Sequence, residues 1–259
     1  MLVTIDVGNT QTVMGLFDGE ELVDQWRLST VRERTADEYR LFFEGLLRQD
    51  GYRVEQVTGV ALSSVVPEAK EALGAMSREM VDGPVLVIGP GVKTGMAINI
   101  DSPREVGADR VVNAVAAQAR YGTPVISVDF GTSTNFDVVD AEGAYIGGSI
   151  APGLAVSEDA LIAATAALRR VEIVEPRAAI GRSTVEAMQS GLIYGHAGLV
   201  DGIMERLAAE VGGDPARVAT GGLASTIVPH CRSVDIVDDR LTLDGLRLIF
   251  DRNMGEPHE

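Results

Sequence analysis

The sequence predicts an α/β protein made of two related domains, and three observations support this prediction. An internal repeat comes first: Asp6-Val7-Gly8-Asn9-Thr10 returns as Asp129-Phe130-Gly131-Thr132-Ser133. Each copy also follows a β-rich run and leads into a second apolar run. Amphipathic helix patterns then follow each copy, as expected where helices cover a sheet.

Each copy of the repeat has the pattern of a strand, a glycine-containing turn and a second strand. The first strand covers 2–5 in one copy and 125–128 in the other. The returning strands end at the polar turns Asp18-Gly19-Glu20 and Asp140-Ala141-Glu142-Gly143. Two equivalent hairpins in one chain indicate two related domains that face each other.

The helix that follows the first hairpin is predicted from Thr35 to Arg48. Thr35-Ala36-Asp37-Glu38 is a capping-box pattern. One helical face then collects apolar side chains, namely Tyr39, Phe42, Phe43, Leu46 and Leu47. We predict strands at 59–65 and 84–88.

A second capping-box pattern, Ser183-Thr184-Val185-Glu186, opens a helix that runs toward Ile193. A third helix is predicted over 111–120. The domain boundary lies between residues 110 and 125, which gives domains of residues 1–115 and 116–259, each with one hairpin.

Composition limits the possible partners and location. A chain of 259 residues that is 46% hydrophobic can bury a substantial core. The net charge of −16 disfavours binding to nucleic acid or an anionic membrane. Cys231 is the single cysteine, which excludes an internal disulfide. With no signal-like opening and no apolar run that spans a bilayer, we expect a cytoplasmic protein.

The two hairpin turns are suited to binding phosphate. Small residues let backbone N–H groups approach an anion, and Thr and Ser hydroxyls add hydrogen bonds. Asp6 and Asp129 stand at strand ends, where carboxylates can hold hydrated cations near the phosphates. Either hairpin alone is explained about equally well by a simple tight turn, whereas the pair favours a functional role.

Other site classes lack their patterns. No Walker loop occurs, residues 89–95 have the wrong spacing for a dinucleotide fingerprint, and no G-x-S-x-G elbow is present. His196, His230 and His258 do not have the spacing of metal ligands. Residues 219–222, Ala-Thr-Gly-Gly, either let a backbone approach a nucleotide base or ribose or form a strand-ending turn.

The segment Gly107-Ala108-Asp109-Arg110 is the candidate site for the phosphate acceptor. Asp109 falls in a first helical turn, where an acid ordinarily stabilises the helix dipole by ~0.3–1 kcal/mol. Arg110 beside it can clamp a carboxylate or phosphate. An Asp at a helix N-terminus is expected to have a low pKa, but the loose transition state of phosphoryl transfer tolerates a weak base.

Four motifs together resemble the type III pantothenate kinases: DVGNT at 6–10, EVGADR at 105–110, VDFGTS at 128–133 and GGSIAPG at 147–153. The resemblance extends from Met1 to residue 253, and GADR is its family-specific part. It implies two duplicated ribonuclease H-like domains of the actin-like superfamily, each with a mixed sheet flanked by helices. It also implies phosphorylation of pantothenate by ATP with magnesium and potassium or ammonium, in a homodimer.

The resemblance further assigns roles to individual residues. Asp109 would accept the proton, and Asp129 would bind the monovalent cation, with Asp6 as a possible magnesium ligand through water. The implied ATP contacts are Asp6, Val7, Gly8, Asn9, Thr10, Gln11, Thr12, Val13 and Thr132. The implied pantothenate contacts are Ile100, Gly107, Ala108, Asp109, Arg110 and Thr184.

Two positions depart from the family pattern, and two alternative functions stay open. Ile100 stands where an aromatic residue is common, and Asn135 stands where a second Thr is common. One alternative is a kinase or phosphohydrolase of the same superfamily that acts on another acceptor. The other is a nucleotide-binding regulator with little turnover.

Overall fold

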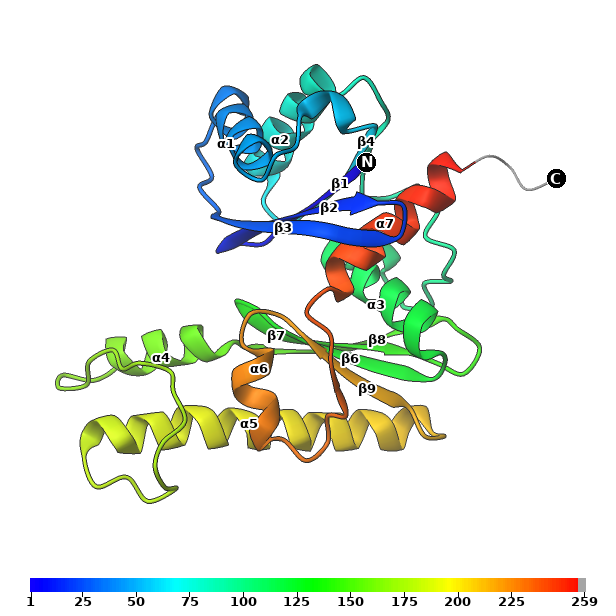
Figure 1. The fold of residues 1–259 in the computed structure, drawn as a ribbon. Helices are drawn as coiled ribbons and strands as arrows, with labels where there is room; N and C mark the ends of the chain where they lie inside the picture. Colours follow the sequence, from blue (N-terminus) through cyan, green and yellow to red (C-terminus); the bar gives the residue numbers. More distant parts are fainter. Residues whose placement is uncertain (256–259) are drawn as a thin grey trace. The chain divides into compact units, whose positions relative to one another are not determined.

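The computed structural model describes residues 1–255, so His258 lies outside the described part. This part of the chain forms two compact units (Figure 1). One consists of residues 1–95, 102–116 and 242–255, and the other of residues 96–101 and 117–241. The expected boundary at 115/116 lies beside the division at 116/117, and the chain returns to the first unit at Thr242.

The first unit is built on a sheet of five strands. Their bounds are Leu2–Val7 (β1), Gln11–Asp18 (β2), Glu21–Ser29 (β3), Gly59–Ser64 (β4) and Val85–Val87 (β5). The strand order is β3-β2-β1-β4-β5. The first three strands form an antiparallel meander, whereas β4 runs parallel to β1 and β5 runs parallel to β4. The predicted hairpin and the strands near 59–65 and 84–88 are confirmed.

The first unit also contains α-helices and short 3₁₀ turns. Their bounds are Ala36–Gln49 (α1), Pro67–Met80 (α2), Ala108–Tyr121 (α3, as far as residue 116) and Leu241–Met254 (α7, from residue 242), with short 3₁₀ turns at Val54–Gln56 and Pro103–Glu105. Thr35 caps α1 in a complete capping box with Glu38, as predicted. Phe42, expected on the buried face of α1, is instead 43% exposed beneath the Arg34 guanidinium.

The helices of the first unit cover both faces of its sheet (Figure 1). Buried side chains of α1 and α2, such as Phe43 and Leu73, join Ile5 and Leu62 in one core. Helix α7 lies on the opposite face, where a Cβ at Gly15 or Gly59 of the sheet would meet α7 side chains. The C-terminal helix therefore completes the first unit.

The second unit repeats the topology of the first. Its strands are Val125–Phe130 (β6), Ser133–Val139 (β7), Tyr145–Pro152 (β8), Ala216–Thr220 (β9) and Ile236–Val237 (β10). Their order is β10-β9-β6-β7-β8, again an antiparallel meander joined to two parallel strands. This shared connectivity confirms the duplicated fold that the repeated hairpin predicted.

The helices of the second unit pack on its sheet. Their bounds are Leu154–Ala163 (α4), Thr184–Val211 (α5) and Ala224–Ile227 (α6), with a 3₁₀ turn at Val228–His230. Ser183 caps α5 by accepting a hydrogen bond from the Glu186 N–H at 3.2 Å, and the helix continues well beyond Ile193. Ile193, Val200 and Met204 of α5 share a core with β6. No helix among residues 1–255 is long and apolar enough to cross a bilayer.

Candidate active site

The first hairpin forms a tight turn after Asp6. The Gly8 N–H donates to the Gln11 carbonyl at 2.9 Å and closes the turn. Asn9, Thr10 and Gln11 are exposed, so this edge of the sheet offers polar groups to solvent. Val7 and Thr12 are buried, and the Thr12 hydroxyl lies 2.9 Å from that of Thr30. These two residues could contact a nucleotide only through their backbone.

Asp6 is the second-to-last residue of β1, just before the hairpin loop. Its Oδ1 accepts a hydrogen bond of 2.5 Å from the hydroxyl of Ser63 on β4. Ser63 is fully buried and stands directly opposite Asp6 in the parallel register. The sequence reasoning missed Ser63, because a serine within an apolar strand has no local pattern that indicates its partner.

The second hairpin has the same closure. The Gly131 N–H donates to the Ser133 carbonyl at 3.0 Å, and Thr132 is exposed at the tip. Asp129 is partly buried and pairs across the ladder with Asn135. The Asn135 side-chain oxygen accepts the Ser133 hydroxyl at 2.9 Å, so this departure from the family pattern is accommodated within the hairpin.

Two glycines lie in close contact with the backbone of the second hairpin. Gly221 has φ +95°, and a Cβ there would collide with the Asp129 carboxylate and the Phe130 backbone. Gly153 donates its N–H to the Thr132 carbonyl at 3.1 Å, and a Cβ would strike the same backbone. Gly221 follows the end of strand β9 and lies close to the second hairpin, which agrees with a strand-ending turn at 219–222. Gly153 also contacts this hairpin, and no motif in the sequence indicated it.

The segment Gly107–Arg110 begins helix α3, as predicted. The Val111 N–H donates to the Gly107 carbonyl at 3.3 Å, which places Asp109 in the first turn. A Cβ at Gly107 would collide with Asp109 Oδ1, so the glycine makes room for this carboxylate. Within residues 1–255, the buried Oδ1 atom has no hydrogen-bond partner.

The environment of Asp109 corrects the expectation of a low pKa. Burial raises the pKa of this carboxyl above its ordinary value. The Arg110 backbone N–H, the Arg110 charge and the Asp109 N–H all act in the opposite direction, without cancelling the effect of burial. The carboxylate is therefore a stronger base than a helix N-terminus alone would make it.

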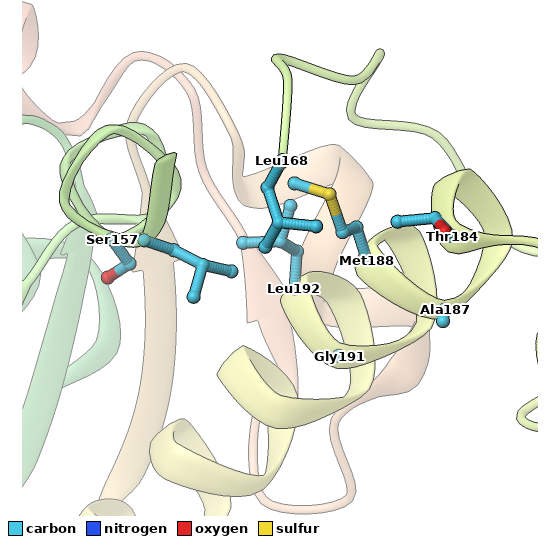
Figure 2. A pocket seen from close by; sticks show the side chains of 8 residues that line it. Ser157, Leu168, Thr184, Ala187, Met188, Gly191 and Leu192 are labelled. Atoms are coloured by element: carbon cyan, nitrogen blue, oxygen red, sulfur yellow. The ribbon is translucent and has the colours of Figure 1, made fainter. Parts of the chain in front are cut away.

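Ile100 and Thr184 lie in the second unit. Ile100 lies next to strand β8 in the chain's hydrogen-bond pattern, because the N–H of the preceding residue, Asn99, donates to the Tyr145 carbonyl of β8 at 2.8 Å. Thr184 is the first residue of α5 and lines an apolar cavity of about 590 Å³ between α4 and α5. Figure 2 shows Leu168, Met188 and Leu192 facing one another in this cavity, with Thr184 further along the helix.

The predicted residues therefore divide between the two units. Asp6–Val13 and Gly107–Arg110 belong to the first unit, and Ile100, Asp129, Thr132 and Thr184 belong to the second. Within the described residues, no three His, Cys, Asp or Glu side chains gather as metal ligands. His196 is a core residue whose Nε2 lies 2.9 Å from the Thr134 hydroxyl. Burial, with a smaller effect of Asp201, raises the pKa of Cys231 to about 12.

Comparisons with known proteins agree on one family. Residues 2–206 match the family described as type III pantothenate kinase. A protein of that name from Acidothermus cellulolyticus is 51% identical over 257 residues, which cover 99% of this chain and 100% of the relative. Another from Moorella thermoacetica is 50% identical over 253 residues, covering 98% and 100%.

A solved structure supports the fold. The activator of the 2-hydroxyisocaproyl-CoA dehydratase from Clostridium difficile, with bound ADPNP, aligns with a TM-score of 0.51 and 14% identity. The alignment covers 96% of this chain and 94% of that one. At this identity the likeness concerns the fold alone, and it agrees with the two duplicated units of this chain.

Proposed function

The chain belongs to the type III pantothenate kinase family, and we infer that it catalyses the ATP-dependent phosphorylation of pantothenate to 4′-phosphopantothenate, the first step of coenzyme A biosynthesis. The reaction forms a bond between the acceptor hydroxyl oxygen and the γ-phosphorus of ATP. The bond from that phosphorus to the bridging oxygen breaks, and ADP leaves. The hydroxyl proton must pass to a base.

Asp109 is the proposed base, and its unpartnered buried oxygen is the observation that carries this proposal. A buried acceptor without a donor costs free energy, which a hydroxyl donor from the substrate would recover. Asp109 would orient the hydroxyl and take its proton late, because the transition state of phosphoryl transfer is loose. The raised pKa of Asp109 makes it a better acceptor than an ordinary aspartate.

The remaining acceptor contacts surround this base in the proposal. Arg110 would clamp the pantothenate carboxylate, since guanidinium binds carboxylates through two parallel hydrogen bonds. Gly107 and Ala108 would contribute backbone atoms at the helix N-terminus, where anions are favoured. Ile100 and Thr184 would add an apolar and a hydroxyl contact.

ATP would be held by the two hairpins. Exposed groups of residues 9–11 at the first turn and the Thr132 hydroxyl at the second would bind phosphate oxygens. Asp6 suits magnesium, because this ion commonly takes one or two carboxylates together with water and phosphate. When bound, magnesium would neutralise charge on the phosphate oxygens. Asp129 would hold potassium or ammonium beside the second hairpin.

We further propose a cytoplasmic homodimer that binds neither nucleic acid nor membranes. The net charge of −16 supports this proposal, because a strongly acidic protein repels nucleic acids and anionic membranes. Exposed apolar side chains support self-association: Ile150 is 66% exposed on strand β8, and Val156 and Leu161 are 41% exposed on α4.

The decisive experiment measures ADP release by the purified protein with ATP and magnesium, with and without pantothenate. We expect release that depends on pantothenate and yields phosphopantothenate. Release with a sugar or acetate instead would identify another kinase of the same fold. ATP binding without release under any acceptor would identify a nucleotide-binding regulator.

A further inference from the structure

We propose that Ser63 is a positioning residue for Asp6 and thereby sets how tightly the first hairpin binds the magnesium ion of Mg·ATP. The inference rests on the proposed role of Asp6 in nucleotide binding. Ser63 belongs to none of the motifs that indicated the active site. Its inferred role rests on its position beside Asp6.

The geometry gives Ser63 one strong contact. Asp6 and Ser63 face each other on the parallel strands β1 and β4, near the carboxyl ends of both. The Ser63 hydroxyl donates to Asp6 Oδ1 at 2.5 Å, and Ser63 has no exposed surface. A hydrogen bond to a carboxylate is shorter and stronger than one between neutral groups. This contact therefore fixes the orientation of the Asp6 carboxylate.

A purely structural serine in this unit looks different. Ser77 is also buried, and its hydroxyl donates to the Leu73 carbonyl one turn earlier in α2, at 2.7 Å. A buried hydroxyl needs only some acceptor, and a backbone carbonyl is enough. Ser63 instead donates to the carboxylate that precedes the Gly8 turn. Residues that hydrogen-bond a metal-binding side chain commonly set its orientation and the metal affinity.

The test measures ATP affinity of the full chain by calorimetry over a series of free magnesium concentrations, without pantothenate. We expect Ser63→Ala to raise the magnesium concentration at which half of the increase in ATP affinity is reached. The expected factor is roughly tenfold, the lower end of the loss of metal affinity caused by removing a residue that hydrogen-bonds a metal ligand. Ser63→Thr keeps the hydroxyl and should restore the wild-type response. Ser63→Cys, close in volume to serine and a weaker donor, replaces the alanine variant if that variant does not fold.

Ser64→Ala is the matched control. Ser64 is the next residue of β4, and its hydroxyl bonds to the backbone of Val66, accepting from the N–H at 3.0 Å and donating to the carbonyl at 2.9 Å. Ser64→Ala should lower thermal stability without changing the magnesium response. An equal change in the responses of Ser63→Ala and Ser64→Ala would overturn the inference, because it would reflect general loosening of the strand.

Asp6→Asn separates this inference from the proposed function. A wild-type response in Ser63→Ala, with a weakened response in Asp6→Asn, would refute the role of Ser63 and leave that of Asp6 intact. A wild-type response in both variants would remove the proposed role of Asp6, and the inference about Ser63 with it.

Discussion

The burial of Asp109 opposes folding at neutral pH, and in the proposed role of this residue as base it would favour catalysis. Its pKa is raised in the folded protein, so the folded state prefers the protonated carboxyl. Stability is therefore highest below the ordinary pKa of 3.8 and falls as the pH rises through the higher folded value. At neutral pH the ionised side chain destabilises the fold, and substrate binding would offset this cost.

Asp109→Asn should accordingly separate activity from stability. The amide resembles the neutral acid, so we expect a Tm at pH 7 equal to or above that of the wild type. Loss of the base should lower pantothenate-dependent ADP release by about 10²–10⁴-fold. Thermal unfolding at pH 7 and pH 4 checks the first expectation, since the stability difference should shrink at the lower pH. A fully active Asp109→Asn protein would disprove the assigned role.

Gly107 provides a second test at the level of single residues. Gly107→Ala places a Cβ where Asp109 Oδ1 lies, so the carboxylate must move. Misplacement by about 1 Å can cost on the order of 10²-fold in rate, and we expect a fall in kcat of that order. ATP affinity, measured by calorimetry, should stay near the wild-type value.

The control for Gly107→Ala is Gly45→Ala on α1. Gly45 is exposed, and a Cβ there would meet no atom within 4 Å. Alanine should stabilise this helix by roughly 0.5–1 kcal/mol and leave the rate unchanged. Equal activity of the two alanine variants would contradict the proposed placement of Asp109.

At the scale of elements, His196 links helix α5 to strand β7 and predicts a response to acid. Burial lowers the pKa of His196 below 6.5, so the folded state favours the neutral ring. Stability is then full above pH 6.5 and decreases as the pH falls below it, because the unfolded chain takes up the proton. The loss cannot exceed about 1.4 kcal/mol per pH unit for one proton.

Thermal unfolding of His196→Gln between pH 7 and pH 5 checks this prediction. The variant should lose less stability over that range than the wild type, whatever its stability at pH 7. Parallel curves for wild type and His196→Gln would show that this ring does not carry the acid response.

The elements that the sequence predicted are those with local signals. Capping-box patterns predicted the helix starts at Thr35 and Ser183, because a cap depends on residues within one turn. Helix α4 was not predicted, because its apolar residues are spread around the helix and do not show the 3.6-residue period of a half-buried helix. The Ser63–Asp6 contact joins residues 57 positions apart, and no local pattern encodes such a pair.

At the scale of the whole molecule, the repeated hairpin was the most informative pattern. It predicted two domains before any strand order was known, and the two sheets have matching connectivity. The sequence did not predict that α7 belongs to the first unit, since the pattern of an amphipathic helix does not indicate which sheet the helix covers. The residues of the candidate site were assigned through family motifs, whereas the raised pKa of Asp109 depends on burial that motifs do not describe.

The acidity of the whole chain leads to the last prediction. A protein with a net charge of −16 binds a polyanionic nucleotide only if local cations and backbone dipoles offset the repulsion. Asp129 lies beside the second hairpin, where a monovalent cation would shield its carboxylate from the phosphates. We therefore expect faster pantothenate-dependent ADP release in potassium than in sodium.

Asp129→Asn tests whether Asp129 is the source of that difference. Removing the charge should raise the potassium concentration for half-maximal rate, because the affinity of an oxygen site for a hard cation falls with the charge of its ligands. Asp140→Asn is the control, because Asp140 lies in the turn after β7, where its carboxylate accepts the Ala144 N–H at 2.7 Å. It should respond to potassium as the wild type does. Equal wild-type rates in potassium and sodium would exclude a selective cation site at Asp129, and the second hairpin would then bind phosphate through its backbone and hydroxyl groups alone.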